Sequence, residues 1–407
     1  MSRYFPLICL ALVHSMVDMF AIVIEPLWPL VGESFQLGKN GIASLMILWA
    51  IMSSTSQVLF GYLRDRFNTS LVLIIAPLLT VAAVGGIGFA PDSYWLFTLM
   101  IFGGLGIGAF HPEAAVTASG LVPENRTRSL SLFMCGGTLG LGLGPFFSGH
   151  LVHAFGLRGL WYMCLPALMI VVFLTSYFRW TTRSFMRESS DLDNPGKGRR
   201  ENRSVDLKYI FQGRVGYTAL LLVVCAMRVV PSVGMSRALA YVLDARGYEE
   251  DWIGTTQSVF LISGGIGMLA SAAFLKRGWE KKVMVVCPLL GIPLVLVIAA
   301  PGIPYGVMVF FLVPTGLLLT GTTPAMVAYS HQLLPRGKGL ASSITMGLCW
   351  GVSGALVAIL VRLFFQTPEY TIGSFAGFLL LSGFSALLLP NPDTLDKNGK
   401  SMVSQFV

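Results

Sequence analysis

Ionisable side chains lie inside two long apolar stretches of the sequence. The segment GLGIGAFHPEAAV, from residue 104 to 116, places His111, Pro112 and Glu113 side by side. The stretch near the N-terminus contains His14 and Asp18, which are four residues apart and so share one face of a helix. Because an ionisable group is costly to bury among apolar residues, it normally faces a partner, a proton or a substrate. These side chains are therefore the first candidates for chemistry.

Four more ionisable residues lie in apolar stretches. Glu25 follows Asp18 by seven residues and stays near its face, and Arg228, Arg237 and His331 lie in the second half of the chain. A guanidinium binds carboxylates and phosphonates through paired hydrogen bonds, so Arg228 is a candidate for holding an anion. At 1.5 Å per residue, Asp18 and Arg228 lie about 18 to 20 Å along their helices, which is near mid-membrane. Glu25 and Arg237 lie nearer the outside, where they could pair as an external gate.

The composition is that of a membrane protein with many spans. Of the 407 residues 54% are hydrophobic and 12% are charged, which is about half the charged fraction of a soluble protein. Apolar runs of about 20 residues, the length that crosses a bilayer as a helix, recur along the whole chain. We predict an all-α integral membrane protein with twelve transmembrane helices, at 5–30, 41–63, 70–90, 94–121, 129–152, 159–179, 215–243, 252–275, 283–301, 304–333, 339–363 and 370–389.

Lysine and arginine are distributed unevenly between the loops. With the N-terminus inside, 22 of the 28 basic residues fall in cytoplasmic segments, as the positive-inside rule requires. The net charge of +8 is therefore a topology signal, and no nucleic-acid partner is expected. We expect a multi-pass protein of a cell membrane, the inner membrane of a bacterium, with both termini in the cytoplasm.

The spans form two related halves. A basic linker at 181–213 separates an N-terminal six-helix bundle at 1–180 from a C-terminal one at 214–390, and a cytoplasmic tail follows at 391–407. A shift of 212 residues places Pro112 on Pro324 and Pro123 on Pro335, which indicates a duplication. Two parallel six-helix halves are typical of transporters that work by alternating access.

The segment GYLRDRFNTSLVL resembles the signature loop of the major facilitator superfamily, a G-x-L-x-D-R-x-G-R-R sequence between spans 2 and 3. Gly61, Leu63, Asp65 and Arg66 match the pattern, whereas Asn68, Thr69 and Ser70 depart from it. Asp65 can meet the positive end of a helix and Arg66 can pair with a carboxylate, so Gly61, Asp65 and Arg66 are predicted to form a cytoplasmic conformational latch. The alternative is a basic loop that only sets topology.

A second segment, SLFMCGGTLGLGLGPFFSG, partly resembles the antiporter motif of the same superfamily in span 5. Gly140, Gly144, Pro145 and Gly149 stand at the expected places. Small residues allow helices to approach closely, and a proline bends a helix. The segment is therefore either an antiporter-like motif or a surface for general helix packing.

The FHPE segment, together with HSMVDMFAIVIEPLWPL in span 1, resembles the fosmidomycin-resistance family within that superfamily. The resemblance covers the N-terminal half well and the C-terminal half only as a generic facilitator half. It implies two pseudo-symmetric six-helix bundles, with spans 1, 4, 7 and 10 lining a central cavity. It also implies a monomeric exporter of drugs or small anions that is driven by protons and needs no cofactor.

Each buried ionisable residue receives a predicted role. We predict Asp18 and Glu113 as the main proton carriers and His111 as the third, because each can take up and release a proton as its exposure to water alternates. The residues predicted to bind substrate or supply a counter-charge are Arg228, His14, Glu25 and Arg237. A fixed structural ion pair is the alternative for each. The six cysteines are scattered singly, so no disulfide framework or metal site is expected.

The FHPE triplet is expected to divide its two ionisable groups. His111 and Glu113 are two residues apart and so point about 200° away from each other on an ideal helix. Pro112 removes the hydrogen bond to the carbonyl of Gly108 and bends the helix, so one group should face the cavity and the other a neighbouring helix. Pro324 is expected to keep the bend in the second half, where the charges are absent.

Several functions remain open from the sequence. The first is a proton-coupled antiporter that exports a small drug-like or anionic solute. A proton-coupled symporter that imports an organic anion or a metal chelate is the second, and a divalent-metal transporter is the third because histidine and carboxylates are metal ligands. An enzyme is not expected, because the sequence has no nucleotide-binding loop and no Gly-x-Ser-x-Gly, and its loops are too short for a catalytic domain.

Overall fold

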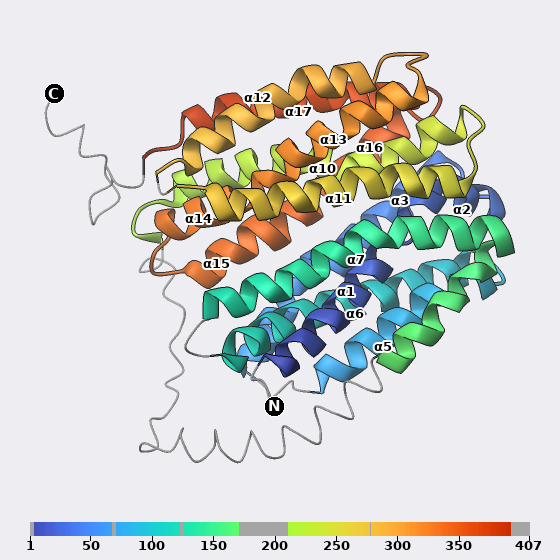
Figure 1. Cartoon of the computed structure of the whole chain (residues 1–407), viewed down its shortest axis with the longest axis horizontal. Coiled ribbons are helices and arrows are strands. Elements are labelled where there is room, and N and C mark those ends of the chain that lie inside the picture. The colour runs from blue at the N-terminus through green and yellow to red at the C-terminus, as the bar shows by residue number, and fades with distance from the viewer. Residues whose placement is uncertain (1–3, 67–70, 123–125, 171–210, 277, 392–407) are drawn as a thin grey trace, which may run out of the picture.

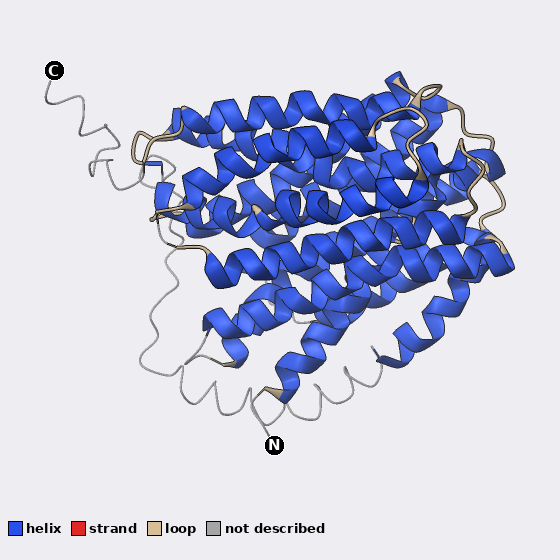
Figure 2. Ribbon diagram, turned by 45° about the horizontal axis from the view of Figure 1, so that its top comes forward, coloured by secondary structure: helices blue, strands red, loops and turns tan. Residues whose placement is uncertain are grey.

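The structure, a computed structural model, describes residues 4–66, 71–122, 126–170, 211–276 and 278–391. Within these residues every regular element is a helix (Figure 2). The described part leaves out the side chains of a few residues on these helices, including those of Asp65 and Arg66. The predicted all-α membrane fold is therefore confirmed for the described residues.

In the described part of the first half, the helices fall at the six predicted spans. Proline residues at 26 and 29 break the first span into α1 (Phe5–Ile22), η1 (Glu25–Leu27) and α2 (Trp28–Ser34), since each removes a backbone donor. The others are α3 (Lys39–Ala50) with η2 (Ile51–Thr55) and α4 (Ser56–Arg66), α5 (Val72–Gly85) with η3 (Ile87–Phe89), α6 (Ser93–Leu121), α7 (Arg126–Phe155), and η5 (Leu157–Gly159) within the apolar helix Leu157–Ile170.

The second half repeats this layout. It contains α10 (Val215–Asp244), α11 (Glu250–Phe274), α12 (Glu280–Ile298), α13 (Tyr305–Gly321), α14 (Thr323–Leu333), α15 (Lys338–Ser342) with η6 (Ser343–Leu348) and α16 (Cys349–Leu363), and α17 (Pro368–Leu387). Its tenth span differs from the expectation, because Pro324 stands after a break at Thr322, whereas Pro112 lies inside the continuous α6. The two prolines therefore have different structural effects.

The helices account for the predicted spans. In the described part of the chain, 10 helices are long and apolar enough to cross a membrane, and the shorter apolar helices Val72–Gly85 and Leu157–Ile170 occupy the third and sixth predicted spans. This is consistent with twelve spans. The sixth predicted span beyond residue 170, most of the linker at 181–213 and the tail after residue 391 lie outside the described residues, so the predicted domain boundaries stay predictions.

The two halves form separate helical bundles that lie side by side. In Figure 1 the blue-to-green helices of the first half and the yellow-to-red helices of the second half occupy opposite sides of the molecule. The bundles meet where α7 packs on α11, α3 with η2 packs on α16, α4 with η2 packs on η6, and α2 with η1 packs on α10. Any movement of one bundle against the other must rearrange these contacts.

Small residues bring α7 and α11 into backbone contact. A Cβ atom on Gly254 would overlap the carbonyl oxygen of Pro145, and one on Gly149 would overlap that of Glu250. Only glycine permits this approach, as at other close helix crossings in membranes. One residue along, the backbone N–H of Phe146 donates to Ser258 Oγ of α11 at 3.0 Å.

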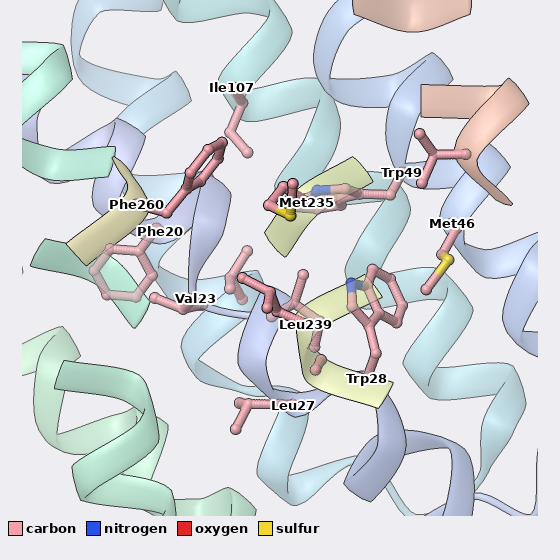
Figure 3. Close-up of a cluster of buried hydrophobic side chains, with 14 of the residues drawn as sticks. Phe20, Val23, Leu27, Trp28, Met46, Trp49, Ile107, Met235, Leu239 and Phe260 are labelled. Atoms are coloured by element: carbon pink, nitrogen blue, oxygen red, sulfur yellow. The ribbon is translucent and has the colours of Figure 1, made fainter. Parts of the chain in front are cut away.

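An apolar cluster fills the space between the halves (Figure 3). Phe20, Val23, Leu27 and Trp28 of the first span meet Met235 and Leu239 of α10, with Phe260 of α11 beside Phe20. Met46, Trp49 and Ile107 complete it from α3 and α6, and all these side chains are at most 3% exposed. Both halves contribute, so the cluster closes the space between them at this level.

Candidate functional site

Three ionisable side chains of the first half form a triad in which His14 and Asp18 are buried and His111 is partly exposed. Asp18 of α1 lies between two histidines: its Oδ2 is 3.2 Å from His14 Nε2, and its Oδ1 is 3.0 Å from His111 Nε2 of α6. The other ring nitrogens face backbone carbonyls, since His14 Nδ1 is 2.8 Å from Phe133 O and His111 Nδ1 is 2.8 Å from Ile107 O. The His14–Asp18–His111 triad therefore joins α1, α6 and α7.

Packing holds the triad in place. The His14 ring stacks on Phe133 with ring centres 4.0 Å apart, and the two histidine rings meet edge to face at 5.2 Å. A Cβ on Gly137 of α7 would lie 2.7 Å from His14 Nε2 and would overlap Asp18 Oδ2. Gly137 thus leaves room for the triad. Gly137 was not a predicted site residue, because its segment contains several glycines.

The second carboxylate of the FHPE segment faces another helix. Glu113 Oε2 is 3.5 Å from Nε of Arg64, which lies near the end of α4. On the same helix, a Cβ on Gly61 would lie 3.9 Å from Pro112 Cβ. His111 and Glu113 therefore point to different partners, as expected from their spacing. Arg64 was not a predicted site residue, because in the sequence it reads as one more basic residue of the loop.

A buried arginine occupies the corresponding region of the second half. Arg228 of α10 is 2% exposed, and Nη1 donates to Ser232 Oγ at 3.1 Å and to the carbonyl of Leu319 at 2.5 Å. Its Nη2 donates to Thr323 Oγ1 at 2.8 Å, and Nε lies 3.2 Å from Met326 Sδ. The break in span 10 leaves the Leu319 carbonyl available to Arg228.

Arg228, predicted to bind substrate or to supply a counter-charge, forms no ion pair with Asp18 in the structure. Within the described residues, no carboxylate forms an ion pair with Arg228, and its hydrogen-bond partners are uncharged. Asp18 is instead held by His14 and His111, two histidines of its own half. The guanidinium therefore keeps its positive charge without a protein anion, and its predicted role in binding an anion stays a prediction.

Glu25 and Arg237 form an ion pair between the halves. Arg237 Nε donates to both carboxylate oxygens of Glu25 at 3.2 Å, and the indole N–H of Trp28 donates to Oε2 at 3.0 Å. Nη1 of Arg237 donates to the carbonyl of Gly354 at 3.1 Å, and Gln257 Nε2 donates to the Glu25 carbonyl at 3.2 Å.

The two partners of this pair are 212 residues apart. This separation equals the repeat offset of the sequence, so the residues occupy equivalent positions in the two halves. Equivalent positions that meet lie close to the axis that relates the halves, and this ion pair must break if the halves separate at its level.

The remaining predicted residues have structural contacts. A Cβ on Gly140 would overlap the carbonyl of Ser15, and one on Gly144 would lie 2.7 Å from the carbonyl of Met19, so these motif glycines pack α7 on α1. His331 Nε2 lies 2.7 Å from Ser342 Oγ. The side chains of Asp65 and Arg66 lie outside the described part, so the predicted latch stays a prediction.

Two groups of side chains have donor atoms suited to a metal ion. The ligand atoms of His14, Asp18 and His111 lie within 4.8 Å of one another, and so do those of an exposed group on the loop side of α7 and α11. That second group consists of His153, Glu249 and Asp251. No metal site was predicted from the singly scattered cysteines, and this stays a prediction.

The two helical bundles and the ionisable residues buried in their spans define a polytopic membrane transporter. A sequence profile described as Major Facilitator Superfamily matches residues 8–358, and the chain belongs to this superfamily. It is therefore a transporter and not an enzyme, as predicted.

Relatives refine the comparison. The chain is 25% identical over 397 residues to the uncharacterized MFS-type transporter YfnC of Bacillus subtilis, which covers 96% of this chain and 93% of that protein. It is 22% identical over 389 residues to the fosmidomycin resistance protein of Escherichia coli, with 94% and 92% covered. The resemblance drawn from the FHPE segment is thus confirmed. A multi-drug resistance efflux pump, PmrA of Streptococcus pneumoniae, is 29% identical over 164 residues, or 38% and 40% of the two chains.

Solved structures share the fold. A bacterial homolog of the human lysosomal transporter Spinster, in an inward-facing and unoccupied conformation, superimposes with a TM-score of 0.74 at 14% identity, covering 98% of both chains. A D-xylose–proton symporter gives 0.68 at 15% identity, covering 98% of this chain and 100% of that one. At these identities the likeness concerns the fold alone.

Proposed function

We propose that the protein exports a small drug-like or anionic solute in exchange for protons, by alternating access. The observation that carries the proposal is the separation of buried charge between the halves. The first half contains the His14–Asp18–His111 triad, and the second contains Arg228 without a carboxylate partner among the described residues. Asp18 and Arg228 each stand thirteen residues into their helices, about 20 Å from the start.

The two charged sites are suited to different species, an anionic group of the solute and protons. The guanidinium of Arg228 can bind a carboxylate, phosphate or phosphonate of the solute through paired hydrogen bonds, which would supply the missing negative charge. The triad can take up protons when it opens to the acidic side and release them on the other side. Exchange follows if the protein changes conformation only when one of the two sites is filled.

The pair Glu25–Arg237 is the proposed outer gate. It joins the halves beside the apolar cluster of Figure 3, and both side chains are 4% exposed. The state described here has this gate closed, and an outward-open state requires its separation. Closing of the opposite side is assigned to the latch residues Gly61, Asp65 and Arg66, by resemblance only.

The relatives support export over import. A fosmidomycin resistance protein and a multi-drug resistance efflux pump are among them, and drug resistance follows from removal of the drug. We also propose that the protein works as a monomer in a bacterial inner membrane with both termini in the cytoplasm, and that its partners are the solute and the lipid bilayer.

A liposome assay tests the proposal. The protein is reconstituted into liposomes with an acidic lumen and a trapped pH dye, and the anionic phosphonate fosmidomycin or the cation ethidium is added outside. Antiport predicts that the lumen becomes alkaline when solute is added, because protons leave as solute enters. Asp18→Asn and Glu113→Gln should abolish this signal, and Arg228→Gln should abolish it for fosmidomycin. Acidification of the lumen would indicate symport, and full proton movement in both carboxylate variants would refute the proton assignment.

A further inference from the structure

The hydrogen-bond geometry of the triad fixes which ring nitrogens are protonated. His14 Nδ1 faces the carbonyl of Phe133 and His111 Nδ1 faces the carbonyl of Ile107, both at 2.8 Å. A carbonyl oxygen only accepts hydrogen bonds, so each Nδ1 must carry a hydrogen. In a neutral imidazole with a hydrogen on Nδ1, the Nε2 atom has only a lone pair. Both rings therefore present an acceptor to Asp18 unless they bind a further proton.

The contacts with Asp18 need two further protons. His14 Nε2 faces Oδ2 at 3.2 Å and His111 Nε2 faces Oδ1 at 3.0 Å, so each ring uses a different carboxylate oxygen. An ionised carboxylate also offers only lone pairs, and each contact is a hydrogen bond only with a proton between the nitrogen and the oxygen. A single proton would leave one contact as lone pair against lone pair, which is costly in a buried site.

We propose that the His14–Asp18–His111 triad binds two protons together, and that His14 is a proton-binding residue on the same footing as Asp18 and His111. With both protons bound, the triad carries one net positive charge, as two imidazolium rings and one carboxylate or as one imidazolium, one imidazole and one carboxylic acid. With both protons released it carries one net negative charge, and acceptors of α1 face an acceptor of α6.

The proton between Asp18 and His111 therefore stabilises the contact between α1 and α6, and the proton between His14 and Asp18 fixes the carboxylate on α1. Release of both replaces one hydrogen bond within α1 and one between α1 and α6 by repulsive contacts, so the two helices separate more easily in the deprotonated state. This ties the occupancy of the site to the position of the first span, which also carries Glu25 of the outer gate. Loss of the proton on the His14 side alone leaves the hydrogen bond between the helices in place.

The other titratable groups around the triad are few. On α6 the neighbour is Glu113, which pairs with Arg64 of α4. On α1 and α7 the nearest titratable side chains are Cys9 and Cys135, and α5 offers none between residues 72 and 85. Among the described residues, the two protons are thus shared by the triad itself.

If the protein is the proposed antiporter, the two-proton site implies that it moves two protons for each solute. This statement about coupling rests on the proposed function. The two-proton site itself is independent of transport. Two measurements separate these statements, one of proton binding and one of coupling.

Nitrogen-15 NMR of the histidine-labelled protein measures proton binding directly. The chain has five histidines, so His14 and His111 can be assigned by single substitutions. We expect the signals of both rings to change over one shared pH range, with a second proton gained by at least one ring, and each neutral ring to carry its hydrogen on Nδ1. A neutral ring with its hydrogen on Nε2, or a second proton on neither ring over the whole range in which the protein is folded, would overturn the two-proton site.

The solute gradient at zero net flux measures coupling. With the membrane potential clamped at zero, a pH difference of one unit sustains a solute gradient of about 100-fold for two protons and about 10-fold for one. His14→Gln places a permanent amide donor where Nε2 stands, so it should lower the gradient from the first value to the second while transport continues. His150→Gln, which changes an exposed histidine, should leave the 100-fold gradient intact.

The outcomes separate the two proposals. A 10-fold gradient in the wild-type protein, with two protons seen by NMR, would overturn two-proton coupling and leave proton antiport standing. A solute gradient that does not change with the pH difference would overturn the proposed function. The NMR result would still decide the two-proton site. An unchanged 100-fold gradient in His14→Gln would overturn the role of His14.

Discussion

At the residue scale, the buried charges are arranged by their backbone contacts as much as by one another. Each histidine of the triad uses one nitrogen to hold a main-chain carbonyl, which leaves the other nitrogen for Asp18. Arg228 is held in a similar way, by a carbonyl and two hydroxyl groups. These hydrogen bonds keep the side chains in place when a proton or a ligand is lost. We therefore expect the change in charge to shift the helices that carry them.

Gly137 provides a test of this fixed geometry. In Gly137→Ala the new methyl group would occupy the space of Asp18 Oδ2 and His14 Nε2, so the triad must shift. We expect proton-driven transport to fall by about tenfold or more, since overpacking a tight site costs about 1–3 kcal/mol. The measurement is the initial rate of alkalinisation in the liposome assay.

A matched glycine controls for the effect of alanine on a helix. Gly216 of α10 has open space around its Cβ position, so Gly216→Ala should transport at the wild-type rate. Equal rates for Gly137→Ala and Gly216→Ala would mean that the triad does not depend on the space at residue 137.

At the scale of elements, the two halves use one scaffold with different chemistry. The repeat offset of 212 places His111 on Thr323, and each residue contacts a charged side chain of the first span of its own half: Asp18 in one case and Arg228 in the other. The scaffold holds a His–Asp–His triad in one half and a hydrogen-bonded arginine in the other. The main local difference is the helix break at Thr322, which frees a carbonyl for Arg228.

The crossing of α7 and α11 gives a prediction at this scale. Gly254→Ala would drive a methyl group into the carbonyl of Pro145, and backbone atoms cannot move aside as a flexible side chain can. We expect the free energy of unfolding to fall by about 1–3 kcal/mol, measured as a lower Tm in detergent. Gly373→Ala is the control, because its Cβ would lie at an ordinary 3.7 Å from Ala299 Cβ. A Tm drop of the same size in both variants would argue against a special crossing.

At the scale of the whole molecule, the Glu25–Arg237 pair connects the halves on the axis that relates them. Removing one partner leaves a buried charge alone, which typically costs about 3–5 kcal/mol. Glu25→Gln should therefore shift the population towards a state that is open at the outer end. The separation of spin labels at positions 39 and 363, on opposite halves in a variant without native cysteines, should increase.

The reversed pair supplies the control for this experiment. Glu25→Arg combined with Arg237→Glu restores an ion pair across the same axis, so the short label distance should return. If both the single variant and the reversed pair show the wild-type distribution of distances between the spin labels, the Glu25–Arg237 pair does not gate the outer side.

Transporter class, helical fold and family could be read from the sequence, because they depend on local composition. The length of an apolar run decides whether a helix spans the bilayer, whatever it packs against. The residues of the candidate site were also found, since an ionisable residue within a span is costly and therefore conspicuous. Their partners were only partly found. Glu113 meets Arg64, and Arg228 meets no described carboxylate.

The sequence by itself therefore determined that this chain crosses the membrane many times, in two related halves, with its buried ionisable candidates in spans 1, 4, 7 and 10. Tertiary structure decided which of them meet. His111 reaches Asp18 across 93 residues of chain, and Glu25 reaches Arg237 across 212. Such contacts depend on how closely helices approach, which small residues such as Gly137 set. The physical reason is that transfer into a bilayer is summed residue by residue, whereas pairing of charges requires atoms of different helices to meet within about 3 Å.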